Sequence, residues 1–95
     1  SIDFGQSSSL EVLSLNGVGV PDVPKLRNTP ASLEYVDFYG VDFSHISRSR
    51  VEDLPRSGVT YFFSNDYSSR VREFAPDLSI GEVNLLRDVY DQAGF

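Results

Sequence analysis

Apolar side chains in the first half of the chain follow one pattern twice. Residues 9–20 align with residues 32–43 at an offset of 23, and five of the twelve aligned positions are identical. Each copy has apolar residues at positions x, x+3, x+5 and x+8: Leu10, Leu13, Leu15 and Val18 in the first, and Leu33, Val36, Phe38 and Val41 in the second. The step from x+3 to x+5 is typical of a β-strand, and Gly17 and Gly40 behind it allow a turn. Each copy is therefore predicted to form a short strand followed by a turn.

A third, degenerate copy begins at Val59, at an offset of 26 from the second. Val59, Phe62 and Tyr67 take its first, second and fourth apolar positions. Because side chains alternate along a strand, this alignment places Tyr61 and Phe63 on the face away from the core.

This spacing resembles the leucine-rich repeat, L-x-x-L-x-L-x-x-N/C-x-L, which has a period of 20–29 residues. The usual Asn or Cys at x+8 is replaced by Val18, Val41 and Tyr67, so apolar packing must replace the hydrogen bonds of that Asn. The resemblance implies an α/β fold, a solenoid fragment with short parallel strands in which Leu33 lies beside Leu10 and Phe38 beside Leu15. Its single domain spans residues 1–95, with repeats at about 10–32, 33–58 and 59–78. The alternative is a small α+β domain in which the similar strands are hairpin partners or coincidental.

The segments between the copies are predicted to return the chain along the other side of the core. Prolines make the first return irregular, and Leu26 is its inward anchor. The second return has Ile46, Val51 and Leu54 as anchors, in a short helix. The third, residues 68–78, carries a helical stripe that Pro76 interrupts.

A helix over about residues 79–93 is predicted to end the chain and to cap the last repeat. Ser79 and Glu82 have the spacing of a capping box, Leu78 and Val83 that of a hydrophobic staple, and Gly94 is a C-terminal stop. The N-terminal end has no comparable cap. We expect missing repeats or another chain to cover it.

Charge and composition argue against some classes of binding partner. The 95 residues carry a net charge of −6, so neither a nucleic acid nor a membrane surface is expected as a partner. Residues 1–9 lack the basic and apolar parts of a signal peptide, and the chain has no Cys, which favours an intracellular protein. The first residue, Ser1, suggests a processed or excised piece.

Catalytic chemistry is not expected, and neither is a cofactor. His45 is the one histidine, and its neighbours Asp42 and Ser44 are too close in sequence to form a relay with it. Without Cys and with one His, no metal site of the usual spacing exists. Arg48 and Arg50 indicate a solvated helix face or, as an alternative, an anion site.

The residues between the apolar strand positions are the predicted partner-binding surface. They are Tyr35, Asp37, Tyr39, Tyr61 and Phe63. Aromatic side chains provide large contact areas in protein interfaces. The sequence thus predicts a non-catalytic protein–protein interaction module, and the resemblance implies, as one option, a substrate-recognition arm of a larger assembly such as an F-box ubiquitin ligase. Two alternatives are a structural subunit in which these aromatics are permanently buried, and a small acidic enzyme or inhibitor domain.

Overall fold

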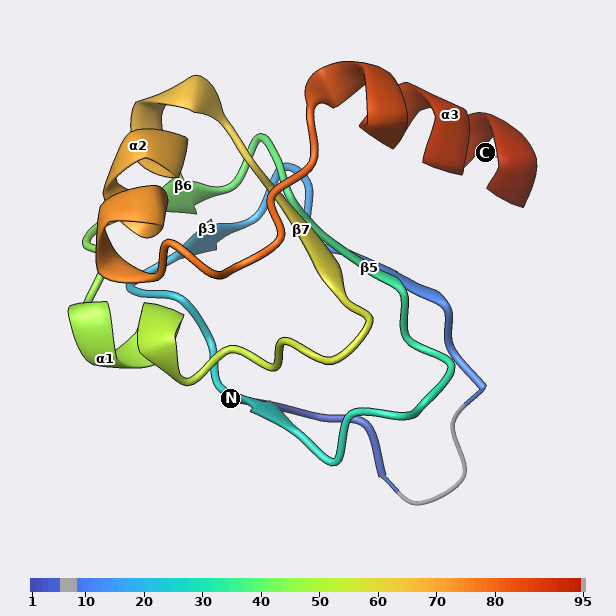
Figure 1. Ribbon diagram of the computed structural model, residues 1–95, viewed down its shortest axis with the longest axis horizontal. Helices are drawn as coiled ribbons and strands as arrows, with labels where there is room; N and C mark the ends of the chain where they lie inside the picture. The colour runs from blue at the N-terminus through green and yellow to red at the C-terminus, as the bar shows by residue number, and fades with distance from the viewer. Residues whose placement is uncertain (6–8, 95) are drawn as a thin grey trace.

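The described part of the chain forms a small α+β domain of short strands and three helices (Figure 1). The computed structural model describes residues 1–5 and 9–94; residues 6–8, part of the stretch that argued against a signal peptide, lie outside the described residues. The strands are β1 (Ile2–Asp3), β2 (Val12–Ser14), β3 (Gly19–Val20), β4 (Leu26–Arg27), β5 (Tyr35–Phe38), β6 (Asp42–Phe43) and β7 (Thr60–Phe63). The helices are α1 (Arg48–Glu52), α2 (Asn65–Phe74) and α3 (Val83–Ala93).

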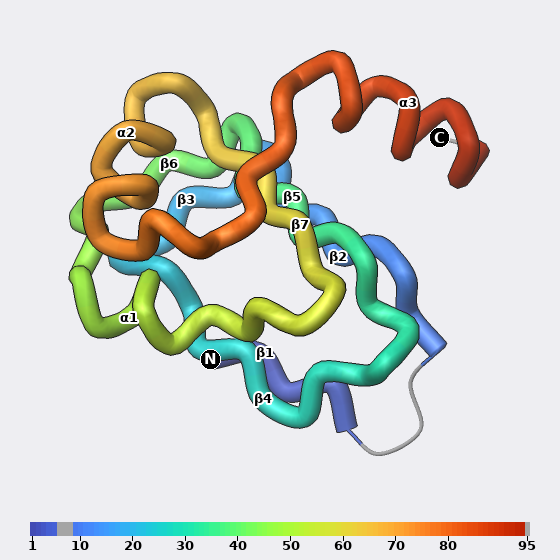
Figure 2. The backbone as a smooth tube through the Cα atoms, viewed as in Figure 1, coloured from blue at the N-terminus to red at the C-terminus, as the bar shows by residue number. Residues whose placement is uncertain are grey.

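All strand pairs in these elements are parallel. β5 lies between β2 and β7, β1 pairs with β4, and β3 pairs with β6. Val12 faces Tyr35 across the first ladder, an offset of 23 residues, so the predicted parallel pairing of the first two copies is confirmed. Gly17 and Gly40 both have left-handed backbone angles in the turns behind these strands. Figure 2 shows β2, β5 and β7 side by side, and their pairing is parallel.

The register predicted for the third copy is wrong by one residue. Thr60 faces Tyr35 and Tyr61 faces Val36, an offset of 25 rather than 26. A shift of one residue exchanges the two faces of a strand. Tyr61 and Phe63 therefore point into the core, where their rings lie 6.3 and 5.2 Å from that of Phe38, centroid to centroid.

The core is complete around the second copy and incomplete around the first. Leu33, Val36 and Phe38 are buried as predicted. Leu10, however, is 37% exposed, and Leu13 and Leu15 are only partly buried. The reason is position: among the strands of the described residues β2 lies at the edge of its sheet, so its side chains have a neighbouring strand on one side only.

The predicted anchors of the return segments are largely confirmed. Ile46, Val51 and Leu54 are buried around α1. α2 begins at Asn65, three residues before the predicted segment, and ends before Pro76. Its Val71 is buried against the core.

The start and the position of the last helix differ from the prediction. α3 begins at Val83, after Glu82, and has no side-chain cap. Ser79 does not form a capping box, because its carbonyl accepts a hydrogen bond from the Tyr61 amide and residues 79–81 run along the free edge of β7. The predicted stop is confirmed, since Gly94 ends the helix in a left-handed conformation. α3 itself lies over one face of the β2–β5–β7 sheet, away from α1 and α2 (Figure 1).

Candidate interaction face

The outer face is the side of the β2–β5–β7 sheet that points away from the main core. Alternation along the three strands places on it Val12, Ser14, Tyr35, Asp37, Thr60 and Phe62, with Tyr39 just beyond β5. Phe62 is 1% exposed and Asp37 is fully buried. The outer face is thus covered in this structure, and a second small core forms on it.

α3 covers the outer face with one stripe of side chains. Its Leu86 and Val89 are buried and form an apolar cluster with Phe62. The Tyr35 ring stacks near Phe62, with 6.0 Å between ring centroids. Gly81, just before α3, lies so close to Phe62 that a Cβ there would be 2.4 Å from Cε1 of the ring. Glycine at this position therefore allows the chain to cross Phe62 and to lay α3 on the sheet.

The carboxylate of Asp37 is buried where α3 contacts the sheet. The Tyr39 amide donates to Oδ1 of Asp37 at 2.7 Å, and the Ser14 hydroxyl donates to Oδ2 at 3.2 Å. The Tyr90 hydroxyl of α3 also donates to Oδ2, and it lies 2.9 Å from the Ser14 hydroxyl. Burial raises the pKa of Asp37 above its ordinary value, against the opposing effect of the hydrogen bonds from the Tyr39 amide and the Ser14 hydroxyl.

Asp37 is expected to make the fold less stable as pH rises. Because its pKa is higher in the folded state, its stabilising contribution is complete below the unfolded-state pKa and is lost as pH rises through the folded-state pKa. We expect Asp37→Asn to be at least as stable as wild type at neutral pH, since the amide nitrogen donates to the Ser14 and Tyr90 oxygens and the amide oxygen still accepts from Tyr39.

Urea unfolding of wild type and Asp37→Asn across the acidic to neutral range measures this effect as the difference between the two curves. The difference should favour the Asn variant increasingly as pH rises. An Asn variant less stable by more than about 1 kcal/mol at neutral pH would show that the fold needs the carboxylate charge.

Two hollows show that α3 packs incompletely at its ends. One, of about 190 Å³, lies between the last turn of α3 and the sheet, where Gln92 and Ala93 stand opposite Glu11 and Glu34. The other, of about 140 Å³, lies beside the first turn of α3, at residues 81–83. The tight contact is thus confined to the middle of the helix.

Three of the five residues predicted to bind a partner lie on the outer face, and two do not. Tyr35 and Tyr39 are partly exposed at the margin of α3, and Asp37 lies beneath Tyr90. Tyr61 and Phe63 are 0% and 4% exposed in the main core, so their predicted place on the binding surface is wrong.

The sequence did not predict that Phe62 and three residues of the apolar stripe of α3 meet on the outer face. The α3 residues are Leu86, Val89 and Tyr90. One signal was present, because an apolar run such as Tyr61-Phe62-Phe63 indicates a strand that is covered on both faces.

Two of the groups considered for catalysis contact other residues. His45 Nε2 lies 3.4 Å from the Ser47 hydroxyl, while Asp42 accepts a hydrogen bond from Tyr67. Within residues 1–5 and 9–94, no three His, Asp or Glu side chains gather in a way that would hold a metal ion. In the same described part of the chain, no helix has the length and apolar character needed to cross a membrane.

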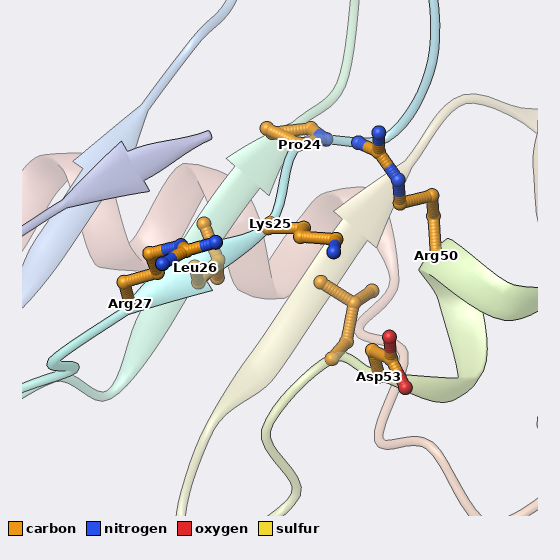
Figure 3. A pocket seen from close by; sticks show the side chains of 7 residues that line it. Pro24, Lys25, Leu26, Arg27, Arg50 and Asp53 are labelled. Carbon is orange, nitrogen blue, oxygen red and sulfur yellow. The ribbon is translucent and has the colours of Figure 1, made fainter.

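The two arginines considered as an anion site make separate structural contacts. Arg48 lies over the Phe74 ring, with 4.6 Å from its Cζ to the ring centroid, and Arg50 donates to the Val23 carbonyl at 3.0 Å. Arg50 also lines a hollow of about 240 Å³ with Lys25, which precedes β4, and Arg27 of β4, next to Asp53 (Figure 3). This basic hollow lies apart from the outer face, so its side chains provide control positions for tests of that face.

No protein-family model, no curated protein and no solved structure matches the chain.

Proposed function

We propose that the chain is a non-catalytic protein-interaction module of the leucine-rich-repeat type, which binds a protein partner through the outer face. The main observation in support is the packing of α3 on the outer face. An amphipathic helix lies on the outer face and buries apolar side chains around a hydrogen-bonded carboxylate. The outer face therefore has the shape and chemistry to hold a polypeptide.

The parallel ladders support the repeat assignment. Their offsets of 23 and 25 residues fall within the 20–29 residues of a leucine-rich repeat. Side chains at matching positions stack in columns, as Val12, Tyr35 and Thr60 do on the outer face. Columns of this kind on a shared strand face are the usual binding surfaces of stacked repeats.

Tyr35 is expected to contribute to partner binding more than to stability. It is partly exposed at the margin of α3, and aromatic side chains in such positions are frequent hot spots. Ligands selected against the native chain from a library of displayed peptides should bind Tyr35→Ala about 5- to 150-fold more weakly than wild type. Isothermal titration of the selected peptides measures this loss.

Arg50→Ala is the matched control, because Arg50 lies in the basic hollow apart from the outer face. It should change the affinity by less than about threefold. Selected ligands that depend on Arg50 and ignore Tyr35 would place the binding surface on the wrong side and reject the proposal. Circular dichroism of each variant confirms that the fold is retained.

A structural subunit is the second candidate, and the open side of the first copy favours it. Leu10 and Val18 are 37% and 44% exposed, while their counterparts Leu33 and Val41 are each 2% exposed. In the second copy these positions are covered by neighbours on both sides, so another chain or repeat that covered the first copy would bury them in the same way. β7 differs, because residues 79–81 already pair with its free edge.

Solution mass separates the two candidates. A folded monomer in sedimentation experiments supports the interaction module, whereas an obligate subunit should associate or aggregate through the open side. Val18→Ser should restore solubility in the second case and change little in the first.

A further inference from the structure

α3 shows which side chains the outer face accepts. Leu86, Val89 and Tyr90 stand at i, i+3 and i+4, and therefore point to the same side of the helix. The first two fill the apolar cluster around Phe62, and the Tyr90 hydroxyl reaches Asp37. The outer face thus accommodates two apolar side chains of a helix and accepts a hydrogen bond from the phenol group of a third.

The contact that holds α3 is small. Its other side chains are exposed, including Val83 and Leu85 at 38% each, and hollows lie at both of its ends. A helix of 11 residues has little stability without its tertiary contacts. Loss of the contacts at Leu86, Val89 and Tyr90 is therefore expected to release the whole helix.

The last turn of α3 carries no positive charge to complement the acidic side chains next to the sheet beneath it. Glu11 and Glu34 line the hollow opposite Gln92 and Ala93, and the last turn of α3 has no basic residue. Basic side chains in a last turn are favoured both by the helix dipole and by nearby carboxylates. A helix with Lys or Arg at these two positions would match the outer face better than α3 does.

We propose that the outer face binds an amphipathic helix of a partner protein, with two apolar residues and a tyrosine at i, i+3 and i+4 and a basic last turn, and that this helix displaces α3. The inference rests on the proposed function and names its partner class. α3 competes with the partner helix for the outer face as a tethered segment of the same chain. It covers the apolar outer face until a helix that binds more tightly displaces it.

The test uses the full chain with the substitutions Leu86→Asp and Val89→Asp, which are expected to release α3 from the outer face. Both lie in α3, so no residue of the sheet is substituted; this variant is called the undocked chain. The probes are a synthetic peptide of residues 79–94 and the same peptide with Gln92→Lys and Ala93→Lys. The undocked chain should bind the native-sequence peptide with one-to-one stoichiometry, and at least about tenfold more tightly than the wild-type chain, where tethered α3 competes. The basic peptide should bind the undocked chain about three- to tenfold more tightly again, with a gain that falls as salt is added.

Matched controls separate docking from nonspecific association. A peptide that itself carries Leu86→Asp and Val89→Asp should not bind, and a Tyr90→Phe peptide should bind several-fold more weakly because it cannot donate to Asp37. Amide exchange in β5 and β7 confirms that the undocked chain is folded. If the double substitution prevents folding, Tyr90→Ala in the full chain is used in its place.

A locked chain tests displacement. Because the protein has no Cys, Val12→Cys and Ala93→Cys, which line the same hollow, accept a thiol cross-linker that ties α3 to the sheet. Cross-linking should abolish the binding of the basic peptide and of the ligands selected against the native chain.

The outcomes distinguish this inference from the proposed function. A folded, undocked chain that binds neither peptide overturns the inference, and so does a basic peptide that binds no better than the native sequence. Selected ligands that bind the locked and unlocked chains equally well also overturn displacement, while the interaction function stands. Failure to select any ligand that depends on Tyr35 overturns the proposed function itself.

Discussion

Phe38→Ala is expected to destabilise the protein by about 3–5 kcal/mol, enough to unfold a domain of this size. The Phe38 side chain is fully buried and contacts three other aromatic rings of the core. Its removal would leave a cavity that the surrounding strands cannot fill without losing their register. Urea unfolding followed by circular dichroism measures the loss.

Leu10→Ala is the control, because Leu10 belongs to the same repeated pattern but is 37% exposed. Its substitution should cost less than about 1 kcal/mol. Equal losses at the two positions would mean that the first copy is packed as tightly as the second, contrary to the structure.

Tyr61→Ala is also expected to cost about 3–5 kcal/mol. Its ring is fully buried beside Phe38, and its hydroxyl donates to the Pro55 carbonyl at 2.6 Å. The sequence pattern predicted Tyr61 on the binding surface, where truncation would change stability little. Thermal unfolding of the variant distinguishes the two placements directly.

Tyr61→Phe separates the ring from the hydroxyl. It keeps the packing and leaves the Pro55 carbonyl without this donor, at a cost of about 1 kcal/mol. A Tyr61→Ala variant that is as stable as wild type would contradict the assigned register of β7.

The first two copies were predictable because their sequences distinguish the two faces of each strand. In β5 the inward residues Val36 and Phe38 alternate with Tyr35 and Asp37, and the identical spacing in the first copy fixes the parallel register. β7 lacks this contrast, since Tyr61, Phe62 and Phe63 are all apolar or aromatic. A pattern with equal residues on both faces cannot decide between offsets of 25 and 26.

The position of α3 was not predictable from its own sequence. Its amphipathic stripe indicates that one side is buried, but the stripe alone does not say against which surface. The capping-box pattern at Ser79 and Glu82 was overruled by tertiary contacts, because residues 79–81 gain backbone hydrogen bonds with Tyr61. The outer face is thus a product of long-range packing, and Asp37 receives its Tyr90 partner from 53 residues away.

The most direct test of the outer face is a set of nuclear Overhauser contacts in the isotope-labelled native protein. The structure predicts contacts from the Phe62 ring to the methyl groups of Leu86 and Val89, and contacts from the Phe63 ring to Phe38. Contacts from Phe63 to the methyl groups of Leu86 and Val89, with Phe62 turned to the core, would contradict the register of β7 and the place of the outer face.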